Sequence, residues 1–233
     1  MTEPTNRPRV ICHMASSIDG RIVVDGWPEP GAVRRAYERV HGNYAPDGWM
    51  CGRVTMEPFA KAVRSEEEVA QQNTSGAARD DFIAPGDFDS FAFAIDASGK
   101  LAWQSNDIDG DHVVAILSER VSDAYLTSLR SAGVSYVLAG RESVDVARAL
   151  DKIGTHFHVK TLMLEGGGAI NGSLLAAGLI DEVSLLVAPV ADGRRGMASL
   201  FDADEATSPR GLTLEHVERL EEGVVWLRYL VRA

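Results

Sequence analysis

Three consecutive glycines, Gly166 to Gly168, follow an apolar run (TLMLEG, residues 161–166) and precede a helical pattern that begins near Ala169. A turn between a strand and a helix aims several free backbone N–H groups at one point, which is an arrangement that binds phosphate. Glycine suits this turn because a Cβ would keep a diphosphate away from the main chain and would penalise positive φ values. The pattern is not the G-x-G-x-x-G of the Rossmann fingerprint. The alternative is that the glycines simply allow close packing of strand and helix.

Two carboxyl groups near glycines could supply a proton to a bound substrate. Glu165 directly precedes the glycine triplet, and Asp19 lies in the segment MASSIDGRIVVDG (residues 14–26). A carboxyl group buried beside a substrate can have its pKa raised far enough to protonate it near neutral pH. The alternatives are that Asp19 caps a tight turn before Gly20 and that Glu165 faces water at a strand end.

The elements that must position these residues alternate along the chain, as in an α/β protein. Residues 121–133 and 143–154 have helical patterns, the first with Ser122 or Asp123 as its N-cap. Residues 211–233 alternate on both sides of Glu221-Glu222-Gly223, which predicts an antiparallel hairpin and hence a mixed sheet. The apolar runs expected as strands cover residues 9–18, 48–52, 91–96, 112–118, 135–140, 161–166 and 182–190.

Length and composition predict one domain over residues 1–233, since the chain is 45% hydrophobic and shows neither a repeat nor a linker. Residues 64–90 are polar and rich in helix breakers, which predicts a surface loop or insertion, with a flap over the ligand as the alternative. Cys12 and Cys51 lie in apolar segments and are expected as buried, reduced thiols. His156 and His158 would share one face of a strand, but two ligands are too few, so no metal is expected.

The charge of the chain excludes several kinds of partner. The sequence has 34 acidic and 23 basic residues and a net charge of −11, which argues against general attraction to nucleic acid or to anionic membranes. No run approaches the roughly 18 apolar residues of a membrane span, and the N-terminus does not resemble a signal peptide. We therefore expect a cytoplasmic protein without nucleic-acid or membrane partners.

Three segments in the same order, residues 14–26 with Ser-Ile-Asp-Gly, residues 50–59 (MCGRVTMEPF) and residues 165–193 with Glu-Gly-Gly-Gly, carry a family resemblance. They resemble the reductase domain of the bifunctional riboflavin-biosynthesis deaminase-reductase, in the dihydrofolate reductase-like superfamily. The resemblance implies a three-layer fold with a central mixed sheet of eight or more strands flanked by helices. It also implies NADPH across the carboxyl ends of the strands. The zinc deaminase motifs, H-x-E with P-C-x-x-C, are absent from the sequence, so the resemblance is to a stand-alone reductase.

The resemblance and the residue types together place the site residues. The catalytic candidates are Asp19 and Glu165. Thr55 is expected to contact the cofactor, and the alternative is that it caps a helix beginning near Met56. Substrate contacts are placed at Trp27, Arg34, Arg35, Glu165 and Pro189. Cofactor contacts are placed at Ala15, Gly52, Thr55, Ser118, Arg120, Gly166, Gly167, Gly168, Ala169 and Ile170.

Two phosphate groups need anchors of their own. The 2′-phosphate of NADPH requires a cation or a helix N-terminus, for which either Ser118 with Arg120 or Arg141 is suited by its position after a strand. A substrate phosphate is assigned first to Arg34 or Arg35. The sequence departs from the family pattern at Glu57-Pro58-Phe59, where the family has Asp-x-Pro-x-Leu, and this departure bears on the substrate.

These observations predict an NADPH-dependent oxidoreductase of riboflavin-biosynthesis type. It would transfer hydride to the ribosyl C1 of 5-amino-6-(5-phosphoribosylamino)uracil or a related, phosphorylated heterocycle. The alternatives are a reductase of the same fold that acts on a pterin or a small carbonyl compound, and a non-catalytic nucleotide-binding module. The resemblance also implies a homodimer.

Overall fold

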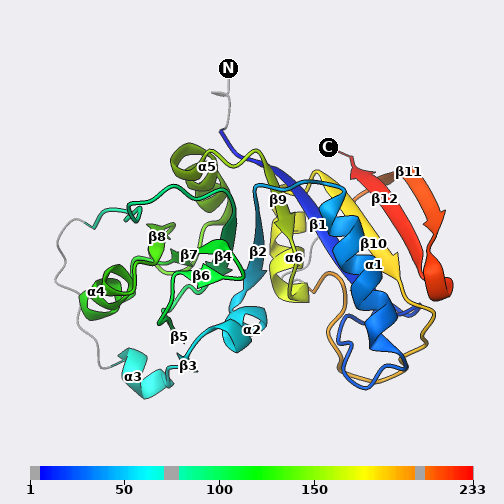
Figure 1. Ribbon diagram of the computed structural model, residues 1–233, viewed down its shortest axis with the longest axis horizontal. Coiled ribbons are helices and arrows are strands. Elements are labelled where there is room, and N and C mark those ends of the chain that lie inside the picture. Colours follow the sequence, from blue (N-terminus) through cyan, green and yellow to red (C-terminus); the bar gives the residue numbers. More distant parts are fainter. Residues whose placement is uncertain (1–5, 71–78, 203–207, 233) are drawn as a thin grey trace. The chain divides into compact units, whose positions relative to one another are not determined.

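The computed structural model describes residues 6–70, 79–202 and 208–232 (Figure 1). Contacts within the chain define two compact units. The central unit contains residues 1–8 and 47–160, and the terminal unit contains residues 9–46 and 161–233. The single-domain boundary expected from the sequence stays a prediction.

The terminal unit is built on five strands of mixed orientation, in the order β11-β12-β10-β1-β9. Strand β1 (Arg9–Ser16) is parallel to both β9 (Thr161–Leu164) and β10 (Glu182–Val187), whereas β12 (Val225–Val231) is antiparallel to both β10 and β11 (Leu212–Arg219). The residues of β1 from Val10 to Cys12 are fully buried, as expected for a central parallel strand covered on both faces. The short turn η2 (Glu221–Gly223) joins β11 to β12, which confirms the predicted hairpin.

Two helices accompany this sheet. Helix α1 (Pro30–Gly42) follows β1, and its Val33 and Val40 pack against Leu186 of β10 and Trp226 of β12 in one apolar cluster. Helix α6 (Gly168–Ala176) connects β9 to β10. Helix α6 begins shortly after the carboxyl end of the parallel strand β9, which is where α/β proteins place their ligands, whereas α1 follows β1 after a longer connection, residues 17–29.

The central unit contains further strands of mixed orientation. Strands β2 (Gly48–Gly52), β4 (Phe91–Ile95) and β7 (Asp111–Leu117) are parallel neighbours. Strand β7 also pairs with β8 (Ser135–Leu138) in parallel and with the short β6 (Asp107–Ile108) in antiparallel fashion. The remaining elements are α2 (Arg53–Met56), η1 (Glu57–Phe59), β3 (Ala62–Val63), α3 (Glu66–Ala70), β5 (Leu101–Ala102), α4 (Asp123–Ser131) and α5 (Val146–Phe157).

The α/β class, the mixed sheet and the helices that flank it are confirmed, but some boundaries differ. Ser122 caps α4 by accepting a hydrogen bond from the Tyr125 N–H, as one of the two predicted caps. Helix α5 begins later than predicted, because Asp145 caps it through the Arg148 N–H at 3.0 Å. The same helix runs on to Phe157. The prediction that His156 lies in a strand is therefore wrong.

Two further sequence predictions concern Thr55 and the segment at residues 64–90. Thr55 does not cap a helix near Met56, because α2 already begins at Arg53 with Gly52 as its N-cap. Residues 71–78 of the predicted loop 64–90 lie outside the described residues. On either side of them stand helix α3 and a bridge between Phe82 and Tyr136.

Burial of the cysteines agrees with the sequence prediction. Cys12 and Cys51 are both buried as thiols, and burial raises the pKa of the Cys12 thiol. Within the described ranges, none of the helices has the length and apolar character needed to cross a membrane.

Candidate active site

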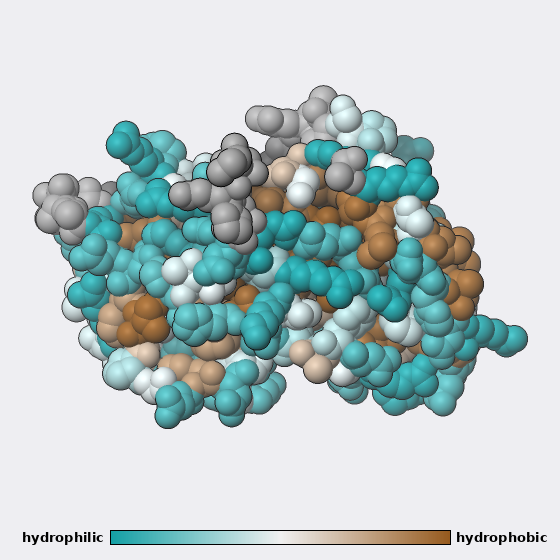
Figure 2. Space-filling model, turned by 90° about the horizontal axis from the view of Figure 1, so that it is seen from above, coloured by the Kyte–Doolittle hydropathy of each residue, from teal (hydrophilic) through white to brown (hydrophobic). Residues whose placement is uncertain are grey.

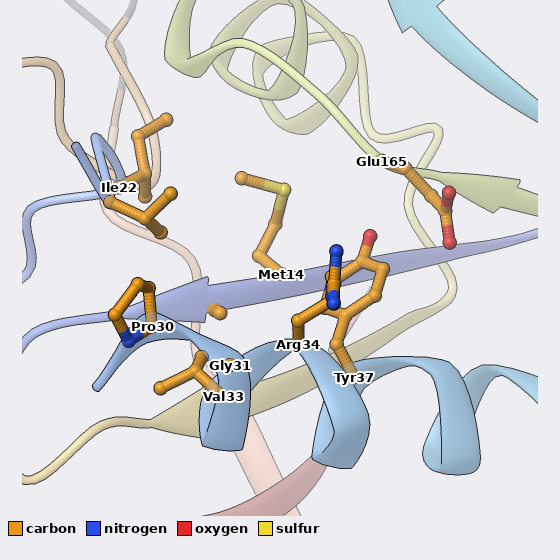
Figure 3. Close-up of a pocket in the computed structure, with 10 residues that line it drawn as sticks. Met14, Ile22, Pro30, Gly31, Val33, Arg34, Tyr37 and Glu165 are labelled. Carbon is orange, nitrogen blue, oxygen red and sulfur yellow. The ribbon is translucent and has the colours of Figure 1, made fainter.

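A cavity of about 490 Å³ lies in the terminal unit beside α1 and the end of β1. Figure 3 shows Arg34 and Tyr37 projecting from α1, Met14 from β1, and Glu165 at the end of β9. The lining is mainly apolar, and its polar side chains are those of Arg34, Tyr37 and Glu165. Such a lining can pack against a heterocycle while a few polar groups orient it. The apolar lining residues are Met14, Ala15, Ile22, Val24, Pro30 and Val33.

Glu165 is the first residue after β9 and places a carboxyl group at the cavity. Its side chain is 15% exposed, and its Oε1 lies 3.5 Å from Nε2 of His41 on α1. Arg34 shares the same cavity, and its most direct carboxylate partner within the helix is Glu38, at 3.8 Å. The structure therefore brings together a predicted catalytic residue, Glu165, and a predicted phosphate anchor, Arg34.

Asp19 is held as a hydrogen-bond acceptor. Its carboxylate accepts hydrogen bonds from the backbone N–H groups of Asp192 and Gly193, both at 2.9 Å, and from the Ser17 hydroxyl at 2.7 Å. These bonds, those from the backbone first, lower the pKa of Asp19 to about 2. A carboxyl group with so low a pKa is ionised near neutral pH and is a poor proton donor. Of the two candidates, the geometry favours Glu165 as the acid and Asp19 as an anchor for the loop at residues 192–193.

The glycine triplet forms the turn that leads into α6. Gly167 is the N-cap residue with φ of 83°, which glycine adopts without penalty, and no side chain caps the helix at this position. The first helical hydrogen bond runs from the Asn171 N–H to the Gly167 carbonyl. The N–H groups of Gly168, Ala169 and Ile170 precede that bond. They form the helix N-terminus that the sequence predicted.

The two sides of this turn differ. A Cβ added to Gly168 would lie 2.3 Å from the Ser199 carbonyl oxygen and 2.8 Å from a carboxylate oxygen of Asp202, so the absence of a side chain at Gly168 serves close packing. A Cβ on Gly167 would meet only Ile170 Cγ2, at 3.7 Å. The open side of the turn is therefore at Gly167. Close packing, one of the two alternatives raised by the sequence, therefore applies to Gly168 and not to Gly167.

Other predicted substrate residues of the terminal unit lie outside this cavity lining. Trp27 is buried in the apolar cluster of α1, and its indole N–H donates to Asp192 at 2.8 Å. Asp192 also accepts from Arg194 at 2.7 Å. Arg35 pairs with Glu222 at 2.7 Å, away from Arg34. Trp27 thus supports the loop that Asp19 anchors.

Pro189, the remaining predicted substrate contact, is exposed and lines a different, smaller cavity. That cavity is formed by residues around the start of α1 and around η2. The structure therefore does not bring Pro189 to the Glu165 cavity.

The predicted cofactor residues of the central unit fall into two groups. Gly52 ends β2, and Thr55 is exposed on α2 directly after it. Ser118 and Arg120 follow β7 and line a second cavity, of about 440 Å³. The Ser118 hydroxyl donates to the Ala97 carbonyl at 2.6 Å, and Arg120 pairs with Glu142 at 3.2 Å.

Several residues of the two cavities were missed by the sequence reasoning. Lys100 lines the central-unit cavity and pairs with Glu66 at 3.1 Å, which adds a second cation beside Arg120. Tyr37 and His41 lie three and seven residues after Arg34, a spacing that places all three on one face of α1. That periodicity was the signal that could have identified them.

The parallel strands, the helix N-terminus after β9 and the cavity with a cation and a carboxyl group are features of an α/β protein that binds small molecules at the carboxyl ends of its strands. The chain matches the RibD C-terminal domain over residues 8–226. It belongs to that family, whose reductases use a nicotinamide cofactor.

Comparisons with individual proteins agree with this membership. The 2,5-diamino-6-ribosylamino-4(3H)-pyrimidinone 5′-phosphate reductase of Methanothermobacter thermautotrophicus is 26% identical over 230 residues, covering 97% of this chain and 99% of the relative. The crystal structure of a pyrimidine reductase-like protein from Corynebacterium diphtheriae has a TM-score of 0.71 at 19% identity, covering 98% of this chain and 93% of that one. Acinetobacter baumannii RibD has a TM-score of 0.65 at 19% identity, and the match covers 98% of this chain and 59% of RibD. The two structures share the fold.

Proposed function

We propose that this protein is an NADPH-dependent reductase that converts a phosphoribosylamino pyrimidine into its ribitylamino form. The observation that carries the proposal is the family match over residues 8–226. The relative from Methanothermobacter aligns over 99% of its length and is a reductase of the 2,5-diamino pyrimidinone. We therefore place that compound first as substrate, and 5-amino-6-(5-phosphoribosylamino)uracil second.

The residues at the cavity suit this chemistry. Reduction requires the open-chain imine at the ribosyl C1 and a proton on the attached nitrogen, and the nicotinamide cofactor supplies hydride to that carbon. Glu165 is the proposed proton donor, because it lies at the cavity and Asp19 is held ionised. Arg34 is the proposed anchor of the substrate phosphate. The apolar wall that includes Met14 and Val33 excludes water from the pyrimidine.

The cofactor contacts are proposed from two structural features. The backbone N–H groups of Ala169 and Ile170, on the open side of the turn at Gly167, are proposed to hold the diphosphate. Gly52 and Thr55 after β2 stay as proposed cofactor contacts. In the central unit, two cations line the cavity after β7, and each is paired with an exposed carboxylate that a phosphate could displace. These cations, Lys100 and Arg120, support a preference for NADPH over NADH.

The test is an assay of both pyrimidines with NADPH and with NADH, followed through the absorbance of the reduced cofactor. We expect the 2,5-diamino pyrimidinone to be reduced with oxidation of NADPH, and the rate with NADH to be lower. The double substitution K100A and R120A is expected to reduce the difference in rate between NADPH and NADH. Cofactor binding without oxidation by either pyrimidine would point to a pterin or a carbonyl substrate. Absence of cofactor binding would contradict the reductase assignment.

We also propose a homodimer that forms through the outer face of the β11–β12 hairpin. Leu212, Leu214 and Val217 are 37%, 52% and 58% exposed. Their pairing partners across the hairpin, Val231, Tyr229 and Leu227, share this face, so the six side chains form one apolar surface. Hydrophobic residues are visible on the right of Figure 2, on the side where Figure 1 places the hairpin. A surface of this kind on a sheet is typical of a subunit interface.

The dimer proposal is tested by the molar mass in solution. Light scattering is expected to give about twice the chain mass of 25.1 kDa. The double substitution L214K and V217K is expected to yield monomers, because it places charges on the apolar face. Val63 is also exposed, at 43%, but lies on β3 of the central unit, so V63K is the control and should leave the mass unchanged. A monomeric wild type would contradict the proposal.

A further inference from the structure

The carboxyl group proposed as the acid lies beside a histidine that the chemistry above does not use. His41 Nε2 is 3.5 Å from Glu165 Oε1, and the two side chains are 30% and 15% exposed. Catalytic hydrogen bonds are often this long in free enzymes and shorten when the substrate binds. The pair therefore connects the cavity with a titratable group on α1.

The position of His41 is set by contacts between α1 and β1. The Tyr37 hydroxyl donates to the His13 carbonyl at 3.0 Å, and the Tyr37 ring lies 4.1 Å from the His13 ring, centroid to centroid. The His13 ring nitrogens lie 3.0 Å from the Ser184 hydroxyl and 3.2 Å from the Tyr37 carbonyl. These contacts fix the helix one turn before His41, from where the His41 side chain reaches Glu165.

The groups that face this pair differ in their charge near neutral pH. His13, whose ring centroid is 6.3 Å from that of His41, is fully buried, and its burial lowers its pKa to about 4. It is therefore neutral. Arg34 and Tyr37 share the helix face with His41 and line the cavity with Glu165. Among the two histidines, His41 is the one placed to exchange a proton with the carboxyl group.

We propose that His41 is a positioning residue that shares one proton with Glu165 and restores it after each turnover, an inference that rests on the proposed reductase function. As hydride adds to the imine carbon, the shared proton passes from His41 Nε2 to Glu165 and from Glu165 to the nitrogen. The pair is then left as a carboxylate and a neutral imidazole. The imidazole takes up one proton from the solvent, which restores the pair and closes the proton balance.

The physical reason for such a pair is the ordinary acidity of a glutamate. A lone carboxyl group with a pKa of about 4.3 is almost fully ionised at pH 7, whereas an imidazole titrates near 6.5. When two titratable groups interact strongly, the apparent pKa at which the last proton leaves is a property of the pair and not of either residue. Together, Glu165 and His41 keep one transferable proton to a higher pH than Glu165 alone.

The first test compares pH profiles of kcat/KM for the wild type, H41Q and H216Q. His216 is the matched control, because its Nε2 lies 3.3 Å from a carboxylate oxygen of Glu218 in an exposed pair on β11. The alkaline limb of the H41Q profile is expected to move to lower pH by about one unit or more, and that of H216Q to stay in place. Added imidazole is expected to restore part of the rate of H41A. A wild-type profile for H41Q would overturn the inference.

The second test does not depend on turnover. Titration of the His41 imidazole by NMR in the free protein should give a lower pKa in E165Q than in the wild type, because the neighbouring negative charge is removed. The His216 titration should not change. A His41 titration that is identical in both proteins would contradict the interaction of His41 with Glu165 but not the proposed reductase function. Wild-type protein that reduces neither pyrimidine would contradict the proposed function, and with it the proton transfer to substrate.

Discussion

Replacement of Asp19 by asparagine separates the roles of the two carboxyl groups near the glycines. Three hydrogen bonds to the Asp19 carboxylate, from Ser17 and from the backbone of Asp192 and Gly193, hold its pKa at about 2. At pH 7 the protonated fraction of such a group is about one part in 10⁵. A general acid typically contributes a factor of about 10² to 10⁴ to the rate. Asp19 is protonated too rarely to supply that contribution.

We therefore predict that D19N lowers kcat by less than about tenfold, whereas E165Q lowers it by about 10² or more. The asparagine keeps one acceptor oxygen but turns an NH₂ group toward a backbone N–H, so the loop at residues 192–193 loses one of its anchors. The melting temperature of D19N should fall for this reason. That of E165Q should stay close to the wild-type value.

The assay measures kcat under saturation with both cofactor and pyrimidine, together with thermal unfolding of each variant. S17A is a matched control, because it removes one donor from Asp19 and leaves both carboxyl groups in place. The reasoning would be refuted if D19N lost about 10²-fold in kcat at an unchanged melting temperature while E165Q kept most of its rate. That result would make Asp19 the acid.

Three further predictions concern the glycine turn, the buried charge cluster and pH. G167D should abolish NADPH binding in a nicotinamide fluorescence titration, because it places a negative charge at the N-terminus of α6. The control G178D, at a glycine with a similar positive φ of 68° beyond the other end of α6, should bind NADPH normally. Wild-type affinity of G167D for NADPH would show that the turn is not part of the cofactor site. R228M should destabilise the protein toward urea by about 2 kcal/mol, because the side chain of Glu182 is fully buried and accepts from Arg228 at 2.8 and 3.2 Å, while Arg9 remains as a partner at 2.5 Å. R232M, on the exposed end of the same hairpin, should change the free energy of unfolding little, and equal effects of the two would contradict the role of the buried pair. Because Asp19 has a folded pKa of about 2 against an ordinary 3.8, its stabilising effect is complete above pH 4 and is lost as the pH falls toward 2, so acid unfolding should be less steep in D19N than in the wild type.

Local patterns in the sequence were sufficient for the elements of the fold. Apolar runs bounded by polar residues predicted the main strands, because a buried parallel strand needs a continuous apolar segment. The Glu221-Glu222-Gly223 turn predicted the β11–β12 hairpin, and the glycine triplet predicted the start of α6 to within one residue. Errors arose where a cap inside a polar stretch decided the boundary, as at Asp145 before α5.

The roles of the site residues depended on contacts that local patterns do not contain. Asp19 is bound to the backbone of a loop 173 residues further along the chain, and Glu165 meets His41 from a helix far earlier in the sequence. The indole N–H of Trp27 likewise donates to Asp192, 165 residues further along the chain. Residue types could therefore identify Asp19 and Glu165 as candidates, but only the tertiary contacts distinguish an anchor from an acid.

Hydride transfer to a ribosyl carbon is the reaction that we propose for this chain. To test it, the protein is incubated with the 2,5-diamino pyrimidine substrate and with NADPH that carries deuterium at the transferable position of the nicotinamide, and the product is analysed by mass spectrometry. We expect a ribitylamino product with one deuterium on C1, formed in proportion to the cofactor oxidised. A product without deuterium at C1, or cofactor oxidation with no change in the pyrimidine, would contradict it.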